Sequence, residues 1–190
     1  MKRIAFAPAF AALLTALPAA AEMEVFSVDP VHTRPTYEVL HFGYSMQRGR
    51  FNKTSGKIML DIAARKGSAD IAIDAASVDS GIAKLDDHLK SEDFLNVAKN
   101  PQIMFKSSDL AFDGDKVKSA AGDLTINGIT RPVTLAVNVF HCAPNPFNKK
   151  RQCGGDLVTT IKRSEFGMKY GLPGLADEVT LRIPVESYKD

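Results

Sequence analysis

The chain has 190 residues, with 24 basic and 22 acidic side chains and a formal net charge of +2. This length suits one domain with a sizeable buried core. The near balance of charge gives no electrostatic basis for binding nucleic acid, which requires an excess of Lys and Arg on a surface.

The first 21 residues have the order of a secretory signal peptide. Lys2 and Arg3 precede an apolar stretch over residues 4–17, and small alanines at 19–21 follow. The apolar stretch is short and broken by Pro8 and Pro18, which disfavours the alternative of a retained membrane anchor. We therefore expect export, cleavage after about Ala21 and a single domain over residues 22–190. Loss of Lys2 and Arg3 would make the mature chain neutral.

Apolar and polar residues alternate with a period of two along most of the remaining chain. Such runs predict half-buried strands, and faces that are apolar on one side only suit antiparallel neighbours. The longest runs cover residues 37–41, 57–62, 69–74, 133–139 and 179–186, with shorter ones at 26–28, 103–105 and 124–126. Asn127-Gly128 predicts a tight hairpin, and Gly122 predicts a bulge where the alternation slips.

One segment, about residues 82–96, departs from this pattern. Ile82, Leu85 and Leu89 have helical spacing, and Ser91 before two acidic residues predicts the N-cap of a second short helix. Pro101 then favours a return to extended chain. Many short strands with one helical insertion predict a sandwich or a barrel, and closure into a barrel removes exposed edges. A barrel of about eight strands can hold one slender ligand.

Cys142 and Cys153 are the only cysteines, and in an exported chain such a pair predicts a disulfide. A metal site with the neighbouring His141 is the alternative, but two further ligands are lacking nearby. We therefore expect no metal.

Catalytic motifs are absent from the sequence: it has no Gly-x-Ser-x-Gly, no His-Glu-x-x-His and no phosphate-binding loop. His32 is expected to stabilise a turn. His41 is read either as a satisfied core histidine, which we favour, or as a polar group facing a ligand. Arg163 is read as a strand-end cation paired with Asp29 or Glu165, with a cation at the barrel mouth as the alternative.

Several segments in order resemble the YceI-like family of bacterial periplasmic proteins. The matching stretches are Phe26-Ser-Val-Asp-Pro-Val-His32, Val39-Leu-His-Phe-Gly-Tyr44, Gly49-Arg-Phe51, Ser55-Gly56, Ser77-Val-Asp-Ser-Gly81, Asp86-Asp-His-Leu-Lys-Ser-Glu-Asp-Phe94, Pro101-Gln-Ile-Met-Phe105, Gly122-Asp-Leu-Thr-Ile-Asn-Gly-Ile-Thr-Arg-Pro-Val133 and Arg163-Ser-Glu-Phe-Gly-Met168.

The resemblance implies an all-β, extended lipocalin-like antiparallel barrel that holds a polyisoprenoid lipid, such as ubiquinone or an isoprenyl phosphate, in the periplasm. It also implies a homodimer and offers no catalytic residue or catalytic cofactor; transient membrane contact would serve ligand exchange. With the alternation, it predicts ligand contacts from Tyr37, Val39, His41, Phe51, Ile58, Leu60, Ile71, Ile73, Leu85, Leu89, Phe94, Phe105, Leu124, Ile126, Leu135, Val137, Arg163 and Phe166.

Two other functions stay open at this point. One is an enzyme that acts on an amphipathic substrate at the barrel mouth, through His41 or Arg163. The other is an interaction or adhesion module that uses the loop from Cys142 to Cys153.

Overall fold

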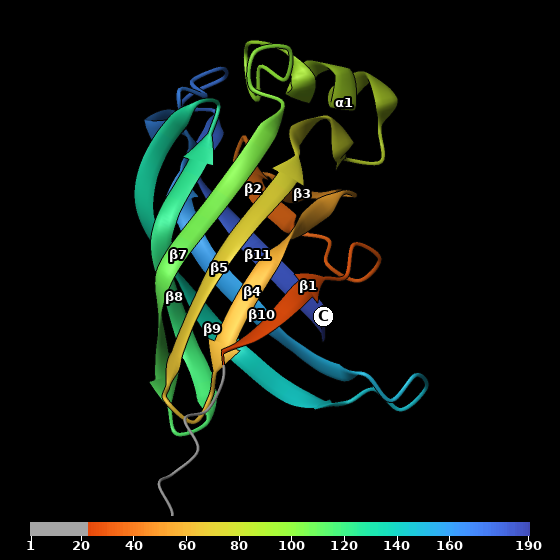
Figure 1. Ribbon diagram of the computed structural model, residues 1–190. Coiled ribbons are helices and arrows are strands. Elements are labelled where there is room, and N and C mark those ends of the chain that lie inside the picture. The colour runs from red at the N-terminus through yellow and green to blue at the C-terminus, as the bar shows by residue number, and fades with distance from the viewer. Residues whose placement is uncertain (1–22) are drawn as a thin grey trace, which may run out of the picture.

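The computed structural model describes residues 23–190, which form one antiparallel sheet closed into a barrel (Figure 1). The predicted signal peptide, residues 1–21, lies outside the described residues. The strands are β1 (Glu24–Val28), β2 (Thr36–His41), β3 (Ser45–Phe51), β4 (Thr54–Asp61), β5 (Lys66–Asp74), β6 (Val78–Asp79), β7 (Gln102–Asp113), β8 (Lys116–Ile126), β9 (Ile129–Pro144), β10 (Arg151–Lys162) and β11 (Leu175–Lys189). The helical elements are α1 (Ala83–Lys90) and two 3-10 turns, η1 (Ala75–Ser77) and η2 (Arg163–Phe166).

Eight strands close the ring, in the order β1-β4-β5-β7-β8-β9-β10-β11 and back to β1. The pair Phe26 and Lys189 joins the first strand to the last. Strand β11 also pairs with β2, which continues the sheet through β3 to β6. The predicted antiparallel barrel with one short helix is therefore confirmed.

Three neighbouring strands are interrupted at the same level of the barrel. The breaks are residues 29–35 between β1 and β2, 52–53 between β3 and β4, and η1 between β5 and β6. The amide of Phe51 donates to the carbonyl of Pro35 at 2.8 Å, and the amide of Asn52 donates to Ser77 at 3.1 Å, so the breaks lie side by side. Each pair of consecutive strands is thus one barrel strand that bends at this level.

The Asn127-Gly128 hairpin is confirmed. Ile126 pairs directly with Ile129, and the two turn residues have φ of 52° and 72°, the left-handed region that this turn requires.

The β7–β8 ladder is irregular at Gly122, as predicted, but the extra residue lies on β7 and the slip of β8 itself lies elsewhere. On β8 the slip lies between Val117 and Ser119, so that Val117 and Ala120 are both buried. A second irregularity on β7, between Lys106 and Asp109, lies opposite Gly122. A Cβ at position 122 would lie 2.3 Å from the carbonyl oxygen of Lys106, which explains the glycine by close approach rather than by its own bulge.

The helical insertion is shorter than the predicted span 82–96. Helix α1 ends at Lys90, and residues 91–99 form turns, so the predicted second helix is wrong. The Ser91 hydroxyl donates back to the carbonyl of His88 at 2.7 Å and therefore caps the end of α1. Phe94 and Leu95 of the following turns are buried against the barrel. In residues 23–190, no helix has the length and apolar character needed to cross a membrane.

Candidate functional site: an apolar cavity inside the barrel

A cavity of about 790 Å³ occupies the inside of the barrel. Its wall is built from the inward faces of every strand except β1, and from α1 and the loop before β11. The lining is dominated by Ile, Leu, Val and Phe side chains, because strand alternation sends every second residue inward. Volumes of this size are typical of sites that enclose a small ligand.

Inward-facing apolar side chains on several strands are only half-buried, although they pack against the core. The half-buried side chains that line the cavity include those of Ile58, Ile71, Ile73, Leu181 and Ile183. In a packed interior such side chains contact partners on all sides. The centre of this barrel is therefore open, and its walls present unpaired apolar surface.

The structure places all but one of the predicted contact residues on the cavity wall. Those on the wall are Tyr37, Val39, His41, Phe51, Ile58, Leu60, Ile71, Ile73, Leu85, Leu89, Phe94, Phe105, Leu124, Ile126, Leu135, Val137 and Arg163. Phe166 is the exception: it is buried in η2 but is not among the lining residues. It follows the end of β10, where strand alternation no longer indicates which way a side chain points.

Other lining residues were not predicted. Leu157, Leu175 and Val179 belong to β10 and β11, and the same alternation that marked other strands was available for them. Met168 and Tyr170 come from the loop between η2 and β11, which carries no periodic pattern. The sequence alone therefore does not indicate that side chains of this loop reach the cavity.

Tyr37 contributes a neutral hydroxyl to the wall. Burial raises its pKa to about 12, with smaller contributions from the negative charges of Asp86 and Asp79. Its ring lies across Gly49, its partner in the β2–β3 ladder: a Cβ there would lie 2.3 Å from the Tyr37 Oη. Gly49 thus makes room for the ring.

Arg163 is buried and holds the loop before β11 in place. Its guanidinium donates to the carbonyls of Ala176 and Met168 at 2.9 Å and to that of Leu175 at 3.0 Å. The predicted pairing with Asp29 or Glu165 is wrong: the anion near Arg163 is Asp177, and burial lowers the Arg163 pKa more than this charge raises it. The guanidinium therefore donates its hydrogen bonds to backbone carbonyls at the edge of the cavity.

His41 is exposed at the mouth, so the favoured interpretation as a core histidine is wrong. It is the last residue of β2, where the hairpin extends past the packed wall, and its ring meets that of Phe42 edge-on at 4.7 Å. His88 of α1 also lines the mouth. Its Nε2 lies 2.9 Å from an Asp93 oxygen, and its ring packs edge-on against Phe94 and Tyr170.

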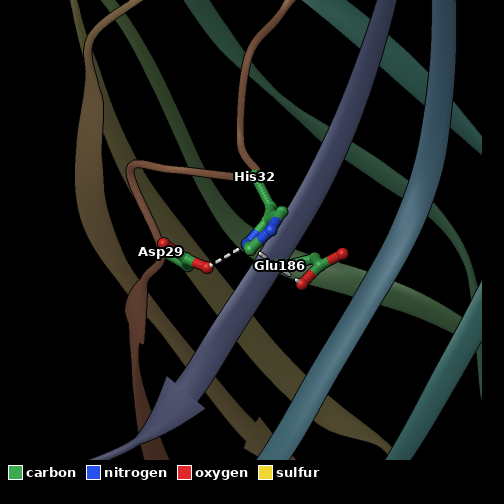
Figure 2. A group of neighbouring side chains, drawn as sticks. All are labelled: Asp29, His32 and Glu186. Atoms are coloured by element: carbon green, nitrogen blue, oxygen red, sulfur yellow. Dashed lines mark hydrogen bonds and ion pairs between the residues drawn. The ribbon is translucent and has the colours of Figure 1, made fainter.

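A separate polar cluster lies at the break between β1 and β2 (Figure 2). His32 Nδ1 is 2.6 Å from Asp29 Oδ2 and 3.7 Å from Glu186 Oε2. The Asp29 hydrogen bond and the two carboxylate charges raise the pKa of His32. The hydrogen bond confirms the predicted turn-stabilising role. These three residues could ligate a metal ion, but Asp29 already accepts from Val31 and Glu186 from Gln152, and none of the three lines the cavity.

The predicted disulfide is confirmed: Cys142 and Cys153 are bonded across the β9–β10 ladder, where they are register partners. This excludes the alternative of a thiolate metal site beside His141. Beyond the disulfide, the hairpin projects at the end of the barrel opposite α1 (Figure 1), with Phe147 93% exposed in its loop.

Comparisons with known proteins agree with this architecture. The model of the YceI-like domain family matches residues 26–187. Protein YceI of Escherichia coli O157:H7 is 37% identical over 158 residues, which is 82% of this chain and 81% of that protein.

Two solved structures share the fold. The crystal structure of Burkholderia cenocepacia BcnA superposes with a TM-score of 0.69 at 29% identity, over 84% of this chain and 98% of that one. A polyisoprenoid binding domain from Saccharophagus degradans superposes with a TM-score of 0.65 at 13% identity, over 89% of this chain and 100% of that one.

Proposed function

The chain belongs to the YceI-like domain family, and we propose that it binds a polyisoprenoid lipid inside its barrel and carries it in the periplasm. The observation that carries this proposal is the cavity of about 790 Å³ with its almost wholly apolar wall. The polyisoprenoid-binding domain of the same fold supports the ligand class.

The apolar wall suits a long hydrocarbon tail. Each buried methylene contributes about 0.8 kcal/mol, so a few isoprene units supply a micromolar affinity even after the costs of association. A bound tail would also restore the contacts that the half-buried wall residues lack.

The charges at the wall favour a neutral head group, such as the quinone of ubiquinone, over an isoprenyl phosphate. Two arginines are among the lining residues, and the guanidinium groups of both are engaged, that of Arg48 on the outer face of the β2–β3 hairpin. Arg163 is bonded to three carbonyls, and Arg48 pairs with Glu38 at 2.9 Å. A phosphate head would have to compete with these bonds for a cation.

Two features support action outside the cytoplasm. The N-terminal residues have the order of a secretory signal, and the disulfide requires an oxidising compartment. The homodimer that the family resemblance implies stays a prediction, for analytical ultracentrifugation to measure.

Organic extraction of the purified full-length product, followed by mass spectrometry, tests the proposal. We expect a prenylated quinone to be recovered. The variant Ala69→Phe puts a ring into the cavity from β5 and should lower the recovered amount at least roughly tenfold by occupying the ligand's space.

The matched control is Ala72→Phe, on the same strand with its side chain on the opposite face, outside the cavity lining. It should retain the quinone. Recovery of no prenyl lipid from wild type, together with failure to take up ubiquinone from detergent, would refute the proposal.

A further inference from the structure

We propose that the mouth of the barrel docks on a phospholipid membrane through a ring of exposed apolar side chains, so that the lipid passes between bilayer and cavity without crossing water. This inference rests on the proposed function. The ring, here called the mouth rim, consists of Leu40, Phe42, Tyr44, Met46, Ile82 and Tyr170.

The rim residues are strongly exposed and lie together. Tyr44 is 89%, Ile82 58% and Phe42 54% exposed. The Phe42 amide donates to the carbonyl of Gly174 at 2.9 Å, which joins the β2–β3 hairpin to the loop that carries Tyr170. The Tyr170 ring in turn lies 4.7 Å from His88 of α1, the helix that Ile82 precedes.

The rim is continuous with the cavity. Phe42, Ile82 and Tyr170 are both exposed to solvent and part of the cavity lining. These three side chains therefore connect the apolar outside of the mouth to the cavity lining. This is the path that a lipid tail needs in order to leave a bilayer.

The outer face of the β2–β3 hairpin changes from charged to apolar towards its tip. Successive cross-strand pairs on this face are Thr36 with Arg50, Glu38 with Arg48, and Leu40 with Met46. The outer face of an antiparallel sheet in water is normally polar along its whole length. The switch at the last pair marks the level at which the hairpin would leave water for the membrane interface.

Phe42 is held in a conformation that folding alone disfavours. Its φ is 49°, in the left-handed region, where glycine or asparagine is the usual residue. Together with Gly43, whose φ is 76°, it forms the tight turn that the Tyr44 amide closes by donating to the His41 carbonyl at 2.9 Å. Here it presents an aromatic ring at the cavity mouth.

Two exposed lysines beside the rim suit the phosphate groups of a phospholipid surface. The hairpin arginines Arg48 and Arg50 are already paired with Glu38 and Asp79, and α1 also carries Asp86 and Asp87. Lys84 and Lys169 are exposed beside the other rim residues. Aromatic and apolar side chains flanked by cations are typical of surfaces that bind at the membrane interface.

Flotation with vesicles of phosphatidylcholine and phosphatidylglycerol tests the inference. Wild type should float with the vesicles, and the partition coefficient of Leu40→Ser/Tyr44→Ser/Met46→Ser should fall at least about tenfold, because three apolar anchors are lost. None of the three residues lines the cavity. The control is Phe147→Ser, which removes an equally exposed ring at the far end and should float like wild type.

A second measurement separates docking from ligand binding. The triple variant should take up ubiquinone from detergent micelles as wild type does, but should extract it from vesicles at least about tenfold more slowly. Wild type that floats but takes up no ubiquinone from detergent would uphold the rim and refute the proposed function. Wild type that does not float, or a triple variant that floats equally well, would overturn the rim. The rim would also be overturned if wild type were a dimer, the triple variant were a monomer and the two floated equally well, since the rim would then bind a second copy of the chain.

Discussion

At the scale of single residues, Arg163 is the side chain that the fold depends on most clearly. It is only 4% exposed and donates to one carbonyl of the loop before β11, that of Met168, and to two at the start of β11, those of Leu175 and Ala176. Arg163→Met should lower the free energy of unfolding by roughly 3–5 kcal/mol, because buried carbonyls lose charged donors. Urea denaturation measures this change.

The control for Arg163 is Arg182→Met. Arg182 is an exposed arginine that pairs with Glu38 at 3.3 Å, and its loss should cost less than about 1 kcal/mol. If Arg163→Met were as stable as this control but bound no quinone, Arg163 would be a ligand-binding cation at the barrel mouth instead.

The His32 cluster makes stability depend on pH. The pKa of His32 is raised from 6.5, mainly by its hydrogen bond to Asp29, and that of Asp29 is lowered from 3.8 by bonds from His32 and Val31 that outweigh its burial. The His32 contribution is complete below pH 6.5 and is lost as pH rises through the folded pKa. The Asp29 contribution is present above pH 3.8 and is lost as pH falls through its own folded pKa.

His32→Gln should therefore lower the melting temperature most at about pH 5.5, with a difference that shrinks towards about pH 8. Differential scanning fluorimetry over this range measures it, with His141→Gln, an exposed histidine of β9, as the control. A difference that stays constant with pH would show that His32 acts through packing rather than charge.

At the scale of elements, alternation predicted most of the strands but not where they bend or slip. The runs at 133–139 and 179–186 became parts of β9 and β11. The break at 29–35 carries Pro30 and Pro35, which marked a turn but not its alignment with two other breaks. That alignment depends on hydrogen bonds between strands far apart in sequence.

The misplaced slip on β8 and the missing second helix have a common cause. At Ser91 the same hydroxyl that can begin a helix instead caps the end of α1. On β8, Ser119 and Ala121 fit either phase of the alternation, because small side chains are tolerated on both faces. Where a residue suits two roles, the local sequence pattern does not show which of them it takes in the fold.

The disulfide staples the β9–β10 hairpin and spans 11 positions of sequence. Replacing both cysteines by alanine should lower the free energy of unfolding by about 3 kcal/mol in the chain-entropy model. Urea denaturation tests this, with dithiothreitol-treated wild type expected to match the variant. Unchanged stability in both would mean that the hairpin is held by its ladder alone.

At the scale of the whole molecule, the sequence could not show that the barrel is hollow. Alternation identifies the inward face of Ile71 or Val137, but a filled core has the same pattern. Whether the centre is open follows from strand number and stagger, which are properties of the closed ring. The sequence also could not place side chains outside the strands. Phe166 was predicted at the cavity wall and is not there, whereas Tyr170 lines the wall but was not predicted.

Removal of the ligand should destabilise the whole barrel. Ubiquinone at about 100 times its Kd would add roughly 2.7 kcal/mol to the free energy of unfolding, because it binds only the folded state. Thermal melts of delipidated protein, with and without added ubiquinone in detergent, measure the shift. Ala69→Phe should melt at the same temperature in both conditions, and an equal shift in that variant would place the ligand outside the cavity.

The pairing of β11 with both β1 and β2 sets an order of events for the growing chain. The ring closes only when residues 175–189 meet residues 24–41, so the contacts of longest sequence separation must form before the barrel is complete. Such contacts form slowly, because the entropy of a very long loop has to be lost first. Until the last strand arrives, the chain has two open edges and no finished wall. A chain with this topology therefore cannot complete its barrel until its C-terminal strand has been made.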